Sequence, residues 1–240
     1  MKSAAANSPA QTLRRMYAVL VEAYGPQRWW PGETTLEIVI GAYLTQNTSW
    51  RAVELSIANL KKHALLALDA LRHIPEEELR ILIKPSGFMR RKAAAIKSFI
   101  AFLDQEYDGS FNKLAAQESA VTRKQLLALP GVGPETADAI LLYALGHPMM
   151  VVDEYLRRIT TRHSLIHDKP RYADIQQLAL DAFAADKPST RTQHYNEFHA
   201  VVVELGKRHC RREPQCAGCP LYQPSFHPPV RPHHPTAAKK

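Results

Sequence analysis

The sequence has no long hydrophobic run and few glycines, and each of these absences excludes a class of protein. The longest apolar stretch, Ala139–Gly146, is far shorter than the ~18 residues that a membrane-spanning helix needs. Only 10 of the 240 residues are glycine, which excludes a collagen-like chain. Residues 1–10 carry one lysine and no apolar block. We therefore expect no secretory signal, no membrane association and an intracellular location.

Cysteine is also scarce. The three cysteines, Cys210, Cys216 and Cys219, fall within one ten-residue window. An odd number of cysteines without a secretory signal argues against a disulfide framework. Their clustering favours a loop that binds a metal ion or an iron–sulfur cluster.

Positive charge, in contrast, is in excess. Lysine and arginine number 31 against 23 aspartate and glutamate residues, which gives a net charge of +8 at pH 7. Such an excess favours a polyanionic partner, and nucleic acid is the commonest polyanion in a cell. A basic surface that serves only solubility is the alternative.

Apolar residues recur with the helical period along most of the chain, and no segment shows the alternation typical of a strand. The pattern predicts helices over residues 11–24, 34–44, 88–107, 134–145, 172–185 and 191–207. Further helices are expected to end at Leu60, to begin at Pro75 and to begin after Asp153. A capping box of Thr190 and Gln193 is expected to open the last of the long helices. We therefore expect an all-α fold, followed by a disordered tail over residues 224–240, where proline and histidine are frequent.

The most specific motif is Leu-Pro-Gly-Val-Gly-Pro at residues 129–134, between two helices with apolar faces. Gly131 and Gly133 allow a tight turn that leaves backbone N–H groups exposed. Together with the N-terminus of the next helix, these N–H groups form a site for a phosphate oxygen. An ordinary turn between helices is the alternative, but the net charge favours sequence-independent binding to the DNA backbone.

This motif and its surroundings resemble the helix–hairpin–helix region of the endonuclease III superfamily of DNA glycosylases. The similar segments are residues 129–141, Val151-Val152-Asp153, the loop Leu-Thr-Gln-Asn-Thr at 44–48 and the cysteine loop, and they span about residues 36–221. The resemblance implies two helical domains: a barrel domain over 36–150 that contains the motif, and a second domain over 1–35 plus 151–223 with the cysteine loop. It also implies a monomer that acts on double-stranded DNA.

The resemblance assigns contacts with DNA to several residues. They are Gln46, Asn47, Gly131, Val132, Gly133, Arg208 and Arg211. The polar loop at 45–48 would enter the duplex where the damaged base has left, and the hairpin and the arginines would contact phosphates. The hairpin carbonyls at 129–132 would hold a monovalent cation. The basic run at 90–92 is a further candidate for phosphate contact, with a merely solvated surface as its alternative.

Asp153 matches the catalytic aspartate of the superfamily. Cleavage of an N-glycosidic bond builds positive charge on the sugar, which a nearby carboxylate stabilises while it orients or deprotonates water. A plain helix N-cap is the alternative role, and the two are compatible. Family members that also cut the strand carry a lysine at the position of Glu135, and glutamate cannot form a Schiff base. The sequence therefore predicts a monofunctional glycosylase, in which Glu135 opens its helix or lines the pocket.

Trp29, Trp30 and Pro31 are expected to line the pocket for the extruded base, or else to pack in the core. Tyr43 and Trp50 are weaker candidates that we expect in the core. The Trp-Pro segment resembles the 3-methyladenine glycosylase branch, which implies a cationic alkylated purine that stacks on an indole. A glycosylase for mismatched or oxidised bases, or a DNA-binding protein without catalysis, are the other hypotheses.

The cysteine loop departs from the family pattern at its fourth position, because that ligand would fall near Ser225. A cluster with four thiolates cannot be assembled from this chain. Three outcomes stay open: a [4Fe–4S] cluster with a fourth ligand such as Ser225, a zinc site completed by His209 or His227, or a loop that folds without a metal.

Overall fold

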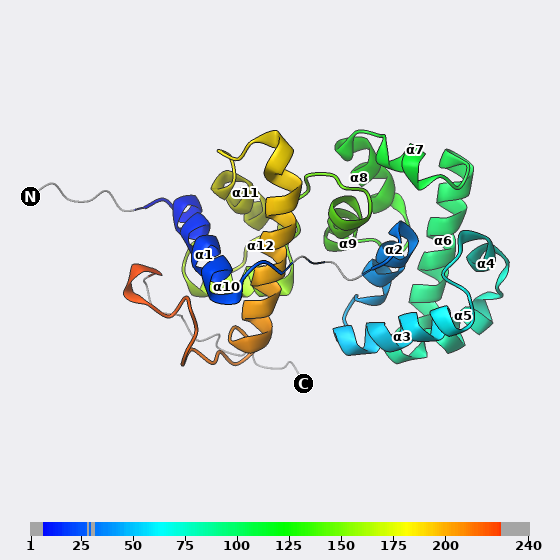
Figure 1. Cartoon of the computed structure of the whole chain (residues 1–240), viewed down its shortest axis with the longest axis horizontal. Helices are drawn as coiled ribbons and strands as arrows, with labels where there is room; N and C mark the ends of the chain where they lie inside the picture. Colours follow the sequence, from blue (N-terminus) through cyan, green and yellow to red (C-terminus); the bar gives the residue numbers. More distant parts are fainter. Residues whose placement is uncertain (1–6, 28, 30–31, 227–240) are drawn as a thin grey trace, which may run out of the picture. The chain divides into compact units, whose positions relative to one another are not determined.

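The structure is a computed structural model that describes residues 7–27, 29 and 32–226. Helices and tight helical turns form all of the regular secondary structure within these residues (Figure 1), which confirms the predicted all-α fold. None of the helices in this part of the chain is long and apolar enough to cross a membrane.

The chain divides into two compact units. The middle unit consists of the described residues within 30–149, and the terminal unit combines those within 1–29 and 150–240. The boundary at 149 and 150 lies one residue from the predicted one. The other boundary precedes Gly32, whereas the sequence placed it between residues 35 and 36.

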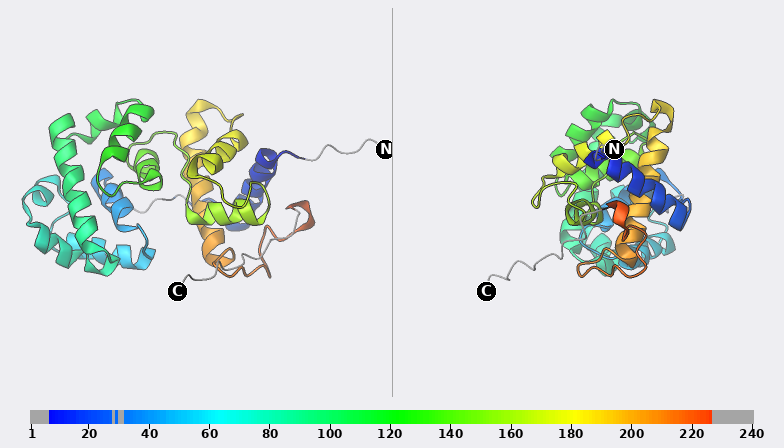
Figure 2. Two further views of the ribbon diagram at one scale, coloured as in Figure 1. Left: turned by 180° about the vertical axis from the view of Figure 1, so that it is seen from behind. Right: turned by 90° about the vertical axis from the view of Figure 1, so that its left-hand side faces the viewer.

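The middle unit is built around one long helix. Its elements are α2 (Thr35–Leu44), α3 (Trp50–Lys62), α4 (Leu68–His73), α5 (Glu76–Leu82), η1 (Lys84–Ser86), α6 (Met89–Tyr107), α7 (Phe111–Ala115), α8 (Ser119–Ala128), α9 (Pro134–Ala139) and the π-helical turn η2 (Ile140–Ala144). Helix α6 packs against α2, α4, α5 and α7, as Figures 1 and 2 show. Tyr43 lies in this core at 1% exposure, as expected, with its ring centroid 5.9 Å from that of Phe99.

The terminal unit joins two segments that are distant in the sequence. Its elements are α1 (Pro9–Tyr24), α10 (Glu154–Arg162), α11 (Tyr172–Ala182), α12 (Pro188–Arg208) and the short turn η3 (Pro224–Phe226). Helix α1 packs against α11 and α12, and α12 also packs against α10. The rings of Tyr17, Phe183 and Phe198 meet in its core, with centroids 5.1 to 5.8 Å apart.

Three details of the predicted elements were wrong. Helix α12 begins at Pro188, with Lys187 as its N-cap, because proline suits the first helical position; Thr190 therefore does not cap it. The helix predicted over 134–145 keeps the regular α form only to Ala139 and continues as η2. Within the predicted tail, Phe226 is buried at 3% exposure because it packs into the terminal unit.

Candidate functional site

The predicted hairpin connects α8 to α9. Gly131 has a φ of 75°, and a Cβ atom there would lie 3.3 Å from the Cβ atom of Ala95, so this position favours glycine on both grounds. Gly133 is exposed, and a Cβ atom there would meet nothing within 4 Å. Val132 is buried, and its N–H donates to the carbonyl of Leu129 at 3.3 Å. This hydrogen bond closes the turn of the hairpin.

The polar loop at 45–48 lies against this hairpin. Nε2 of Gln46 donates to the carbonyl of Gly131 and to Oγ1 of Thr136, both at 3.0 Å. Asn47 is exposed and has a left-handed backbone, with a φ of 52°. Of the two residues predicted to enter the duplex, Gln46 thus contacts the hairpin and Asn47 faces solvent.

Phe88 is a residue to which the sequence assigned no role. It is 61% exposed and has a φ of 47°, directly before α6. Left-handed backbone at a bulky residue costs free energy and is concentrated at functional sites. Arg90 and Arg91 follow, exposed in the first turn of α6, where positive charge opposes the helix dipole. An exposed aromatic residue between a glycine and a basic run is the signal that would have found this surface.

Asp153 caps α10 in the terminal unit, as predicted, and is 8% exposed. Its Oδ1 accepts a hydrogen bond from the N–H of Leu156 at 2.7 Å. Its Oδ2 lies 3.5 Å from Nε2 of His199, which is 6% exposed on α12. The ring centroid of His199 is 5.5 Å from that of Trp29. The carboxylate of Asp153, the imidazole of His199 and the indole of Trp29 therefore lie next to one another, in this order, within the terminal unit.

His199 is a second residue that the sequence did not single out. The histidine lies within a run of apolar residues on α12, and such a residue is more often part of a core. Its neighbour Trp29 was predicted to line the base pocket, while Trp30 and Pro31 lie outside the described residues.

A pocket of about 560 Å³ in the middle unit combines acidic and aromatic side chains. Its lining includes Glu33, Glu37, Trp50, Glu54, Ile57 and Lys61. The ammonium of Lys61 lies 3.0 Å from Glu37 and 3.2 Å from Glu33, and Nε1 of Trp50 donates to Glu54 at 3.0 Å. Trp50, which was expected in the core, packs against it and is partly buried, while one of its sides lines this pocket. The carboxylates outnumber the amine, which favours a cationic ligand.

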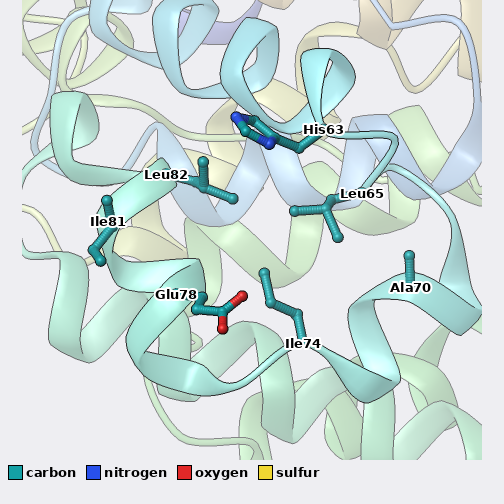
Figure 3. Close-up of a pocket in the computed structure, with 7 residues that line it drawn as sticks. All are labelled: His63, Leu65, Ala70, Ile74, Glu78, Ile81 and Leu82. Carbon is teal, nitrogen blue, oxygen red and sulfur yellow. The ribbon is translucent and has the colours of Figure 1, made fainter.

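Another pocket, of about 450 Å³, lies beside the ends of α3, α4 and α5 (Figure 3). Its lining is aliphatic apart from the ring of His63 and the carboxylate of Glu78. No tryptophan, tyrosine or phenylalanine lines this pocket, and we assign it no role.

Three of the remaining predicted site residues are exposed. Glu135 is in the first turn of α9. Arg208 donates through Nε to Glu204 at 2.6 Å, and Arg211 donates through Nε to the carbonyl of Lys207 at 2.7 Å. Both arginines are oriented by α12 and face solvent.

The start of the cysteine loop is held by a buried arginine. Arg162 on α10 is 2% exposed. Its Nη1 donates to Sγ of Cys210 at 3.1 Å and to the carbonyl of Arg211 at 2.8 Å, and its Nη2 donates to the carbonyl of Arg212 at 2.8 Å. The guanidinium thus contacts the loop where a cluster ligand was predicted.

Two of the three proposed fourth ligands form hydrogen bonds with other residues. Ser225 is exposed and donates to Oε1 of Gln223 at 3.1 Å, and Nδ1 of His209 lies 3.0 Å from the carbonyl of Gln215. His227 lies outside the described residues. Among the residues that are described, no three histidine, cysteine or acidic side chains are placed to hold a metal ion. This donor set does not fit a closed site with four ligands.

Comparisons with known proteins agree on one family. The profile described as HhH-GPD superfamily base excision DNA repair protein matches residues 40–184. A Methanocaldococcus jannaschii protein that carries the name of a DNA repair glycosylase is 39% identical over 213 residues, which cover 88% of this chain and 94% of that relative. Endonuclease III of Bacillus subtilis is 27% identical over 149 residues, or 62% of this chain and 61% of the relative.

Solved structures give the same result. The H. pylori 3-methyladenine DNA glycosylase bound to 1,N6-ethenoadenine matches with a TM-score of 0.73 at 28% identity, covering 84% of this chain and 98% of that one. A non-covalent complex of endonuclease III with DNA matches with a TM-score of 0.73 at 21% identity, over 93% and 95% of the two chains, which shows the shared fold. The family profile covers more than half of the chain, including both the hairpin and Asp153. The chain therefore belongs to the HhH-GPD superfamily of base excision DNA repair proteins.

Proposed function

We propose that the chain is a monofunctional DNA glycosylase that hydrolyses the N-glycosidic bond of an alkylated purine, such as 3-methyladenine, in double-stranded DNA. The placement of Asp153 carries this proposal. Its carboxylate is buried, one oxygen is fixed by the N–H of Leu156, and the other lies beside His199. A carboxylate fixed in advance is suited to stabilise positive charge that develops on the sugar.

The proposed reaction breaks the bond between C1′ of the sugar and the base nitrogen. The bonding electrons leave with the base, and the sugar acquires positive charge that Asp153 stabilises. Water then attacks C1′ and loses its proton to the same carboxylate. The products are the free base and an intact strand with an abasic site.

Strand cleavage is not part of the proposal, because the position of the family's lysine is occupied by Glu135. Borohydride reduction of the reaction mixture tests this point, since it traps a Schiff base as a covalent adduct. We expect no protein–DNA adduct and no strand scission until base is added. Efficient trapping would contradict the monofunctional assignment.

The acidic pocket of the middle unit supports a cationic base. Trp50 offers an aromatic face, and the three glutamates exceed the single charge of Lys61, a combination that attracts a positively charged ring. Trp29 is the second aromatic candidate, because His199 links it to Asp153. The solved relative at 28% identity is named a 3-methyladenine glycosylase and binds a modified adenine, which also supports this substrate class.

The hairpin and its neighbouring loops support binding to duplex DNA. The exposed backbone at Gly133 suits a phosphate oxygen, and Arg90 and Arg91 extend the positive surface. Asn47 and Phe88 are exposed and have left-handed backbone. Their side chains would fill the space in the duplex that the extruded nucleotide leaves. Gln46 then serves to tie its loop to the hairpin.

For the cysteine loop, we propose a structural role without a closed cluster. Arg162 supplies three hydrogen bonds to residues 210–212, and Nδ1 of His163 lies 3.2 Å from the carbonyl of Phe226 at the other end of the loop. These contacts hold both ends of the loop against the C-terminal end of α10. The loop would thereby keep Arg208 and Arg211 on the surface that meets DNA.

A side-by-side assay of base release tests the proposed substrate. Duplexes that carry an alkylated purine, a mismatch or an oxidised base are incubated with the full chain, and the free bases are separated by chromatography. We expect release from the alkylated duplex. Release only from mismatched or oxidised duplexes would show that the substrate is one of these bases and not an alkylated purine. Binding without any release would indicate a DNA-binding protein without catalysis.

A further inference from the structure

Lys92 on α6 is a buried cation whose partners are backbone carbonyls. It is 3% exposed, and within the described residues it forms no ion pair at salt-bridge distance. Its Nζ donates to the carbonyl of Leu44 and to that of Ser86, both at 2.7 Å. Burial lowers the pKa of Lys92 to about 8, so the ammonium is still protonated at neutral pH. Buried lysine is rare because removing its charge from water costs free energy.

Each of the two carbonyls lies shortly before one of the exposed residues with left-handed backbone, Asn47 or Phe88. Leu44 is the last residue of α2 and directly precedes the loop with Asn47. Ser86 is the last residue of η1 and directly precedes Gly87 and Phe88. One ammonium group therefore joins the backbones that present Asn47 and Phe88.

Ser86 extends this connection to the far end of the same loop. Its N–H and Oγ donate to Oγ of Ser56 at 3.2 and 2.7 Å, and its Oγ also lies 3.4 Å from the carbonyl of Ala52. Both Ser56 and Ala52 are on α3, which begins where the loop ends. The loop is thus fixed before residue 45 by Lys92 and after residue 48 through Ser86.

Lys97 provides an internal comparison on the same helix. Its Nζ donates to the carbonyls of Leu71 and Arg72 at 2.7 and 2.8 Å, near the end of α4. The hydrogen bonds match those of Lys92, although Lys97 is only partly buried, and these carbonyls precede neither Asn47 nor Phe88. A role in stability alone would be shared by the two lysines, whereas a role in DNA recognition would belong to Lys92.

We infer that Lys92 is a positioning residue for base flipping, which fixes the loop of Asn47 and the segment of Phe88 relative to each other before DNA binds. The inference rests on the proposed function, because it concerns how the same DNA-binding surface extrudes a nucleotide. A surface that is ordered in advance does not lose conformational entropy on binding, so the free energy of contact remains available to open the duplex. Lys92 itself need not touch DNA.

The test compares Lys92→Met with Lys97→Met in the full chain. Affinity is measured for an undamaged duplex and for one with a tetrahydrofuran analogue of an abasic site, with 2-aminopurine beside the site to report unstacking. We expect Lys92→Met to lower the preference for the analogue about tenfold, as loss of charge-assisted hydrogen bonds implies, and to reduce the fluorescence change. Affinity for undamaged DNA should stay within about twofold, because phosphate contacts are unaffected. Lys97→Met should keep the wild-type preference.

Equal losses on both duplexes, or the same loss of preference in Lys97→Met, would overturn the inference. If Lys92→Met does not fold, Ser56→Ala decides the question, since it weakens the attachment of Ser86: a reduced preference supports the inference and a wild-type preference overturns it. These measurements need no base release. A wild-type chain that prefers the analogue but releases no base would refute the proposed activity alone, and one without preference would refute the role of Lys92.

Discussion

At the scale of single residues, Asp153 caps a helix and is also the carboxylate that we propose for catalysis. Its Oδ1 caps α10 while its Oδ2 lies beside His199. Asparagine caps helices as well as aspartate does, so Asp153→Asn should fold normally. We expect base release to fall at least about 100-fold, the usual contribution of a general base. Single-turnover release from alkylated DNA and the melting temperature measure the two effects.

A matched control exists on the next helix. Asp174 lies in the first turn of α11 and accepts a hydrogen bond from the N–H of Arg171 at 2.9 Å. Asp174→Asn changes the same charge at a similar place in the terminal unit. It should leave turnover unchanged. Near-normal turnover of Asp153→Asn would remove Asp153 from the mechanism.

At the scale of elements, the hairpin allows a clean test of the phosphate contact. A Cβ atom at Gly133 would meet nothing within 4 Å, and the φ of −95° at this position suits any residue. Gly133→Val should therefore preserve stability but block the approach of a phosphate. We expect affinity to fall about tenfold for damaged and undamaged duplexes alike, with Gly133→Ala affected less. A loss confined to damaged DNA would place Gly133 in the lesion pocket instead.

The cysteine loop gives a prediction about stability. Arg162→Met removes the charged donor to two carbonyls and a thiol, and the thiol of Cys210 stays buried without it. We expect the free energy of unfolding in urea to fall by about 2–3 kcal/mol. Arg158→Met, on the same helix, removes a contact with the ring of Tyr155 and should cost less.

Metal analysis of the same loop completes this test. Protein purified without oxygen should contain far less than one iron or zinc per chain, and a chelator should not change its melting temperature. Stoichiometric metal, with a lower melting temperature once it is removed, would refute the proposal that Arg162 and packing hold the loop.

At the scale of the whole molecule, the net charge of +8 predicts DNA binding that depends on salt. Each phosphate contact contributes about −0.9 to the slope of log affinity against log salt concentration. Arg90→Ala should reduce this slope by about 1. Lys113→Ala, at an exposed lysine paired with Asp108, changes the net charge equally and should leave the slope unchanged. Equal effects of the two variants would show that Arg90 makes no direct contact.

The sequence by itself determined the features that depend on neighbouring residues. The helical period predicted the all-α fold, because an amphipathic helix is specified within a few turns. The glycines of the hairpin and the cap formed by Asp153 were predicted for the same reason, since a turn or a cap involves residues only a few positions apart. Local signals were weaker at the start of α12, because Pro188 and Thr190 are both residue types that open helices. The helix begins at Pro188.

Only the tertiary structure decided which distant residues meet. Lys92 lies 48 positions from Leu44, and Arg162 lies 48 positions from Cys210, and no local pattern indicates either contact. The same holds for His199 beside Asp153 and for Lys61 beside Glu33 and Glu37 in the acidic pocket. Such contacts depend on how whole helices pack, which is set by the summed burial of many side chains. The cap formed by Asp153 could therefore be predicted from the sequence, whereas its contact with His199 was decided by the fold.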